Sequence, residues 1–107
     1  MQLKEKKCEP CSGNEKPLER SEIEEFREKL EKGWKVVDDK KIKNSFPFDN
    51  FKEGMEFAQK VATLAEEEQH HPDLCIHYKS VEVEITTHAI GGLSENDFIL
   101  AAKIDDL

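Results

Sequence analysis

Residues 81–88 read VEVEITTH, an unbroken alternation of apolar and polar side chains. Successive side chains of a β-strand point to opposite faces of the sheet, so this period of two predicts a half-buried strand. The buried face would carry Val81, Val83, Ile85 and Thr87. The polar face would carry Glu82, Glu84, Thr86 and His88.

Two segments before this strand are suited to be its sheet neighbours. Residues 75–78 are predicted to form a short strand that pairs with it. Residues 34–48 place apolar side chains on both sides of a polar turn at residues 38–41, which predicts a β-hairpin. Pro47 cannot donate a ladder hydrogen bond, so it marks the end or the edge of the second strand of this hairpin.

The first and last helices are predicted from their capping residues. Ser21 and Glu24 have the spacing of a capping box, and Gly33 ends the helix that they begin. Ser94 and Asp97 have the same spacing at the start of a helix near the C-terminus.

A long helix is predicted between the two strand pairs. Asp49 is its predicted N-cap, and Pro72 prevents it from continuing further. Its predicted apolar stripe comprises Phe51, Met55, Ala58, Ala62 and Ala65, widened by Phe57, Val61 and Leu64.

The predicted order is α-β-β-α-β-β-α. This order describes an α+β fold, a four-stranded antiparallel sheet with three helices packed on one face. Residues 1–20 are polar and show neither period, so we expect an N-terminal arm followed by one domain over residues 21–107. An open sheet face or edge in so small a chain favours a homodimer or homotetramer.

The charge of the chain excludes several classes of partner. Asp and Glu number 24 against 16 Lys and Arg, which gives a formal net charge of -8. Without a basic stripe, nucleic acid and anionic membranes are poor partners. No stretch approaches the roughly 20 apolar residues of a membrane span, and the first residues lack the apolar core of a signal peptide. We therefore expect a cytoplasmic protein.

The cysteines do not form a disulfide framework, because Cys75 lies far in sequence from Cys8 and Cys11. The Cys8-x-x-Cys11 spacing would suit half of a zinc site or a redox pair. It lacks a second pair and a βαβ context, so we assign it no function, although two arms could meet across an oligomer.

Histidines gather near the predicted end of the long helix, where Glu66 is followed by His70-His71-Pro72. Pro72 biases His71 away from helical geometry, so both histidines lie at the frayed helix end. Histidine gives and takes protons near neutral pH, so this pair and His88 could share acid and base roles. Glu66 lies four residues before His70, where its carboxylate could orient that ring or bind N–H groups of a ligand.

Each of these residues also has a plainer interpretation. Adjacent histidines before a proline are typical of an exposed helix end, and Asp97 is typical of a helix cap. Neighbouring residues project in different directions and no zinc-binding spacing is present, so we predict no metal site at the histidines. His77, within a strand, is assigned no role.

Taken together, the chain resembles the pterin-4a-carbinolamine dehydratase family, whose fold is also that of a dimerisation cofactor of a homeodomain transcription factor. The similarity runs from about residue 18 to residue 104. It is carried by Gly33-Trp34, Phe46-Pro47-Phe48, Phe51, Glu66, His70-His71-Pro72, Tyr78, residues 81–85, Thr87-His88, Gly92-Leu93-Ser94, Asp97 and Leu100-Ala101.

The resemblance implies dehydration of 4a-hydroxytetrahydropterin to quinonoid dihydropterin, with no metal or organic cofactor. It implies that His70, His71 and His88 are catalytic and that Glu66 and Asp97 lie in the pterin pocket. We expect His71 to be the principal acid/base, His88 its partner and His70 mainly a binder of the substrate.

Two departures and two alternatives accompany this hypothesis. Glu67 could replace Glu66 if the helix end is irregular, and Leu74 and Cys75 stand where the family often has an aromatic residue. A non-enzymatic module could use the same fold to stabilise a partner protein, but the presence of all three histidines favours catalysis. A dehydratase could also act on another pterin, such as one linked to molybdopterin.

Overall fold

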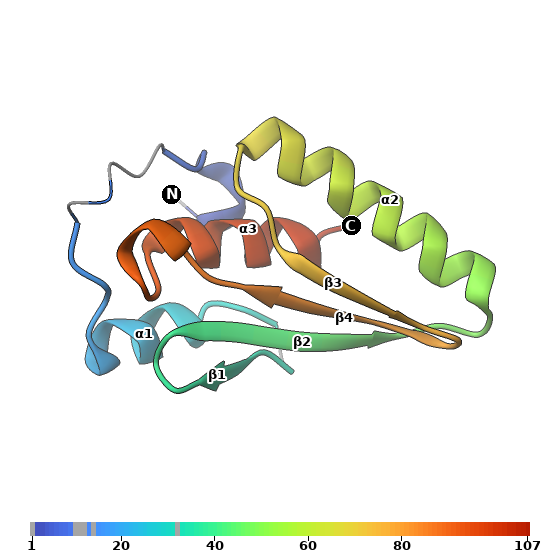
Figure 1. The fold of residues 1–107 in the computed structure, drawn as a ribbon, viewed down its shortest axis with the longest axis horizontal. Coiled ribbons are helices and arrows are strands. Elements are labelled where there is room, and N and C mark those ends of the chain that lie inside the picture. Colours follow the sequence, from blue (N-terminus) through green and yellow to red (C-terminus); the bar gives the residue numbers. More distant parts are fainter. Residues whose placement is uncertain (1, 10–12, 14, 32) are drawn as a thin grey trace.

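The computed structural model describes residues 2–9, 13, 15–31 and 33–107 (Figure 1). Its helices and strands follow the predicted order α-β-β-α-β-β-α, which confirms the α+β fold. Their bounds are α1 Arg20–Arg27, β1 Lys35–Val37, β2 Lys41–Pro47, α2 Phe51–Glu68, β3 Asp73–His77, β4 Ser80–Ile85 and α3 Glu95–Asp105. Two short 3-10 helices, η1 Leu3–Glu5 and η2 His88–Ile90, were not predicted.

The four strands form one antiparallel sheet in the order β1-β2-β4-β3. The predicted alternation of β4 is confirmed, since Val81, Val83 and Ile85 are fully buried and Thr87 is nearly so. The side chains of the three apolar residues meet residues of the helices in one apolar core, including Ile23 of α1, Val61 of α2 and Phe98 of α3. In Figure 1, the β1–β2 and β3–β4 hairpins lie side by side.

The two hairpins agree with the sequence to within a few residues. Asp38 and Asp39 both have positive φ angles, 54° and 56°, as in the type I′ turns that suit the twist of a β-hairpin. The other hairpin begins at Asp73, two residues before the predicted strand, and turns at Tyr78 and Lys79.

The predicted bounds of the first helix are wrong at both ends. Its capping box is formed by Glu19 and Glu22 rather than by Ser21 and Glu24, so α1 begins two residues earlier than predicted. The helix ends at Arg27, well before Gly33. Capping pairs overlap in this acidic segment, and the core position of Ile23 selects between them.

The start and the buried face of α2 also differ from the prediction. The N-cap is Asn50, not Asp49, because the Asn50 Oδ1 accepts the Glu53 N–H at 2.9 Å. Ala58, Val61 and Ala65 are buried as predicted, but Phe51 is 46% exposed, so the buried stripe is rotated away from Phe51. The buried positions are Gly54, Ala58, Val61, Ala65 and Glu68. A Cβ atom at Gly54 would lie 3.4 Å from Val81 Cγ2, so the small residue allows α2 to approach the sheet closely.

Replacing Asn50 by alanine is expected to lower the free energy of unfolding by about 1 kcal/mol, because the Glu53 N–H loses its partner. The matched control is Asp49→Ala, which removes the neighbouring carboxylate but no cap and should change stability by less than about 0.5 kcal/mol. Urea unfolding of both variants measures the difference, and equal losses would show that the cap is assigned to the wrong residue.

Among the described residues, no helix combines the length and apolar character needed to cross a membrane.

Candidate active site

The site begins at the C-terminal end of α2. Gln69 has a left-handed conformation with φ 53°, and the backbone N–H groups of Gln69 and His70 both donate to the Ala65 carbonyl. This turn closes the helix and directs the following histidines away from its axis.

The turn corrects the predicted pairing of Glu66. Its carboxylate meets His71 Nε2 at 2.5 Å, whereas the helical spacing predicted contact with His70. The irregular end was foreseen as a reason for Glu67 to replace Glu66, but the pair with His71 is formed by Glu66. The two side chains are 57% and 72% exposed, so this pair is open to solvent and to a ligand.

His70 has a very different environment. Its Nε2 lies 2.5 Å from Asp97 Oδ1, and the two side chains are 13% and 0% exposed. The other Asp97 oxygen accepts the Ser94 N–H at 2.8 Å and the Thr87 hydroxyl at 2.9 Å. Asp97 therefore caps α3, as its plainer interpretation predicted, and also holds one histidine ring in place.

His88 lies apart from these two pairs. It is exposed at the start of η2 and lines a cavity of about 370 Å³, which extends to the β1–β2 turn at Lys40 and Lys41. Among the described residues, no hydrogen bond joins its ring to His70 or His71. The preceding residue, Thr87, nevertheless donates to Asp97 and so connects the start of η2 to the His70–Asp97 pair.

Sequence reasoning missed the importance of Glu68, one of three consecutive glutamates. Its Oε1 accepts the Cys8 N–H at 2.9 Å and its Oε2 accepts Lys103 Nζ at 2.7 Å, with only 4% of the side chain exposed. Burial would raise the pKa of Glu68, but the Cys8 N–H and the Lys103 ammonium outweigh it and lower the pKa. Only its place on the buried face of the helix could have indicated this role.

Cys11 lies outside the described residues, so half of a zinc site and a redox pair both stay predictions for the Cys8-x-x-Cys11 motif. Cys8 is partly buried, and its Sγ lies 3.5 Å from the Asn96 carbonyl oxygen. Burial, followed by the charge of Glu68, raises the pKa of the Cys8 thiol from 9.0 to about 12. Within the described ranges, no cluster of three or more His, Cys, Asp or Glu side chains is placed to hold a metal ion.

In a chain that carries Cys11→Ser, we expect a thiol reagent at pH 8 to modify exposed Cys75 at least about 100-fold faster than Cys8, because the thiolate is the reactive form. Mass spectrometry of the labelled peptides measures both rates in one sample. The denatured chain is the control, in which both cysteines should react. Comparable rates in the folded chain would contradict the raised pKa of Cys8.

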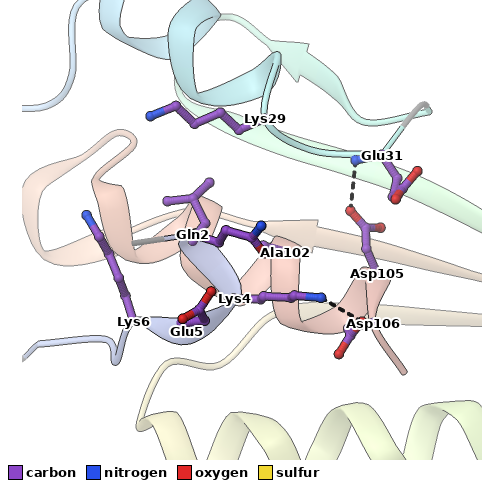
Figure 2. A pocket seen from close by; sticks show the side chains of 10 residues that line it. Gln2, Lys4, Glu5, Lys6, Lys29, Glu31, Ala102, Asp105 and Asp106 are labelled. Carbon is purple, nitrogen blue, oxygen red and sulfur yellow. Dashed lines mark hydrogen bonds and ion pairs between the residues drawn. The ribbon is translucent and has the colours of Figure 1, made fainter.

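A larger cavity of about 720 Å³ lies elsewhere, between the N-terminal segment, the α1–β1 connection and the end of α3 (Figure 2). In Figure 2, Lys4 reaches toward Asp106, and the Glu31 N–H donates to Asp105. Burial raises the pKa of Asp105, partly offset by hydrogen bonds from the Trp34 indole N–H and the Glu31 N–H. No predicted site residue lines this cavity.

Comparison with known proteins agrees on one family. The model of the family "Pterin 4 alpha carbinolamine dehydratase" matches residues 16–107. A relative from Nitrosomonas eutropha that bears the name of this enzyme is 48% identical, covering 98% of this chain and 92% of its own. One from Rubrobacter xylanophilus is 45% identical, covering 99% and 98%. A crystal structure described as a transcriptional coactivator/pterin dehydratase from Brucella melitensis has a TM-score of 0.79 and 34% identity, covering 84% of this chain and 96% of that one.

Proposed function

The chain belongs to the pterin-4a-carbinolamine dehydratase family, and from this membership we propose that it dehydrates a 4a-hydroxytetrahydropterin by acid/base catalysis at its histidines. The enzyme is thus a hydro-lyase whose products are a quinonoid dihydropterin and water.

The unequal surroundings of His70 and His71 carry the proposal. A ring held between a buried carboxylate and the helix end can present one fixed face to a substrate but has little freedom to exchange protons with solvent. An exposed ring paired with an exposed carboxylate can pick up and release protons in each turnover. His70 therefore serves mainly to bind the pterin, and His71 serves as the principal acid/base.

The reaction needs one proton donor and one proton acceptor. The imidazolium of His71 gives a proton to the C4a hydroxyl as the C4a–O bond breaks, and water leaves. The neutral imidazole of His88 takes the N5 proton, and the N5 electron pair forms the new N5=C4a double bond. Solvent returns both rings to their starting protonation states, so the atoms and charges balance over one turnover.

Carboxylates complete the division of roles. Glu66 orients the His71 ring and offers an acceptor for N–H groups of the pterin. Asp97 orients His70, because its second oxygen is already fixed by Ser94 and Thr87. His88 joins the site when a substrate spans from the helix end to η2.

The test is stopped-flow absorbance of freshly generated 4a-hydroxytetrahydropterin, with a metal chelator present throughout. We expect the folded chain to accelerate dehydration well above the spontaneous rate. A chain that is folded by circular dichroism but leaves the spontaneous rate unchanged would contradict the proposal and favour a non-enzymatic interaction module on the same fold.

A further inference from the structure

The N-terminal segment, residues 2–9, contacts the C-terminal end of α2 and the start of α3. Figure 1 shows this segment beside α3 and near the C-terminal end of α2. Leu3 is buried in the core. Later in the segment, Cys8 and Glu9 make polar contacts with the end of α2 and the start of α3. The match to the family model begins at residue 16, so Leu3, Cys8 and Glu9 precede the matched range, whereas Glu68 and Asn96 lie within it.

Two hydrogen bonds join the Asn96 side chain of α3 to the backbone of Glu9, and this pair of bonds is called the clasp. Asn96 Nδ2 donates to the Glu9 carbonyl at 2.6 Å, and Asn96 Oδ1 accepts the Glu9 N–H at 3.0 Å. Only the backbone of Glu9 takes part, whereas Asn96 uses its side chain. The Cys8 Sγ adds a contact to the Asn96 carbonyl oxygen.

The contact with α2 is made by the buried carboxylate of Glu68. One oxygen accepts the Cys8 N–H and the other accepts the ammonium of Lys103 on α3. Glu68 lies two residues before His70, and Asn96 directly precedes Asp97. The segment therefore contacts a residue within two positions of each partner in the His70–Asp97 hydrogen bond.

We propose that Cys8 and Glu9 form a positioning element that holds the end of α2 and the start of α3 in register, so that Asp97 keeps the His70 ring in its substrate-binding orientation. Glu68 and Asn96 are the positioning residues through which it acts. This inference rests on the proposed function only in assigning substrate binding to His70. The geometric part, that the segment maintains the His70–Asp97 hydrogen bond, stands apart from catalysis.

The test compares Asn96→Ala with Glu9→Ala. The first removes both hydrogen bonds of the clasp. The second removes the exposed Glu9 side chain, which takes no part in the clasp, and leaves both hydrogen bonds to the Glu9 backbone intact. Should Asn96→Ala fail to fold, Asn96→Ser replaces it, because serine suits a helix start but is too short to span to Glu9.

The first readout is the His70 Nε2 proton in the NMR spectrum, assigned through its loss in His70→Gln. We expect protection from solvent exchange in the wild type and in Glu9→Ala, and exchange about tenfold faster in Asn96→Ala. An unprotected proton in the wild type, or equal protection in all three proteins, would overturn the proposal. This readout requires no enzymatic activity.

The second readout is the split between KM and kcat for pterin dehydration. In Asn96→Ala we expect KM to rise about three- to tenfold with kcat within twofold of wild type, because His70 binds but does not transfer protons. Loss of kcat alone would contradict positioning through His70. A wild type that protects the His70 proton but dehydrates no pterin would refute the proposed function and leave the positioning role supported.

Discussion

Replacing Glu68 by alanine is expected to lower the free energy of unfolding by about 3–5 kcal/mol, the typical loss when one partner of a buried ion pair is removed. Only 4% of the Glu68 side chain and 16% of the Lys103 side chain are exposed, so the lysine would keep a charge with little water to solvate it. The Cys8 N–H would lose its acceptor as well.

The matched control for this prediction is Glu67→Ala, because Glu67 precedes Glu68 on the same helix but is exposed. Its loss should change stability by less than about 0.5 kcal/mol in urea unfolding. Equal losses of unfolding free energy in the two variants would contradict the stabilising role assigned to Glu68.

The stabilising contribution of Glu68 should be lost in acid. Its folded pKa is lowered below 4.5, so the carboxylate stabilises the fold fully above that value. The contribution is lost as pH falls through the lowered folded pKa. The stability difference between wild type and Glu68→Ala should therefore be constant near neutrality and shrink in acid.

Replacing His71 by alanine is expected to lower kcat for pterin dehydration by about 10²- to 10⁴-fold, the usual contribution of a positioned general acid or base. Stability should change little, because the His71 ring is mostly exposed and Glu66, with which it pairs, is exposed too. The matched control is His77→Ala on β3, an exposed histidine to which we assign no role. If both variants keep wild-type activity, His71 is not the principal acid/base.

The topology could be predicted because it depends on a strong local signal. The alternation of residues 81–88 fixes which side chains of β4 are buried, and short turns leave antiparallel neighbours as the simplest pairing. Helix ends were harder, since Asp49 and Asn50 are both good caps and only the register of α2 against the sheet selects Asn50.

Four of the proposed site residues meet in the structure as the pairs His70–Asp97 and Glu66–His71, and the sequence did not predict this pairing. Sequence spacing joined Glu66 to His70 because it assumed a regular helix, and the left-handed Gln69 gives Glu66 to His71 instead. The partner of His70 is Asp97, from a different helix, and no local pattern encodes such a contact. Glu68 was missed for the same reason, because the N–H that it binds lies 60 residues away, at Cys8.

The most direct measurement is a side-by-side stopped-flow comparison of His70→Ala and His71→Ala over a range of 4a-hydroxytetrahydropterin concentrations. We predict unequal effects, with KM raised by the loss of His70 and kcat lowered by the loss of His71. Equal losses of kcat in the two variants would contradict the division between a fixed binding histidine and an exposed proton-transfer histidine.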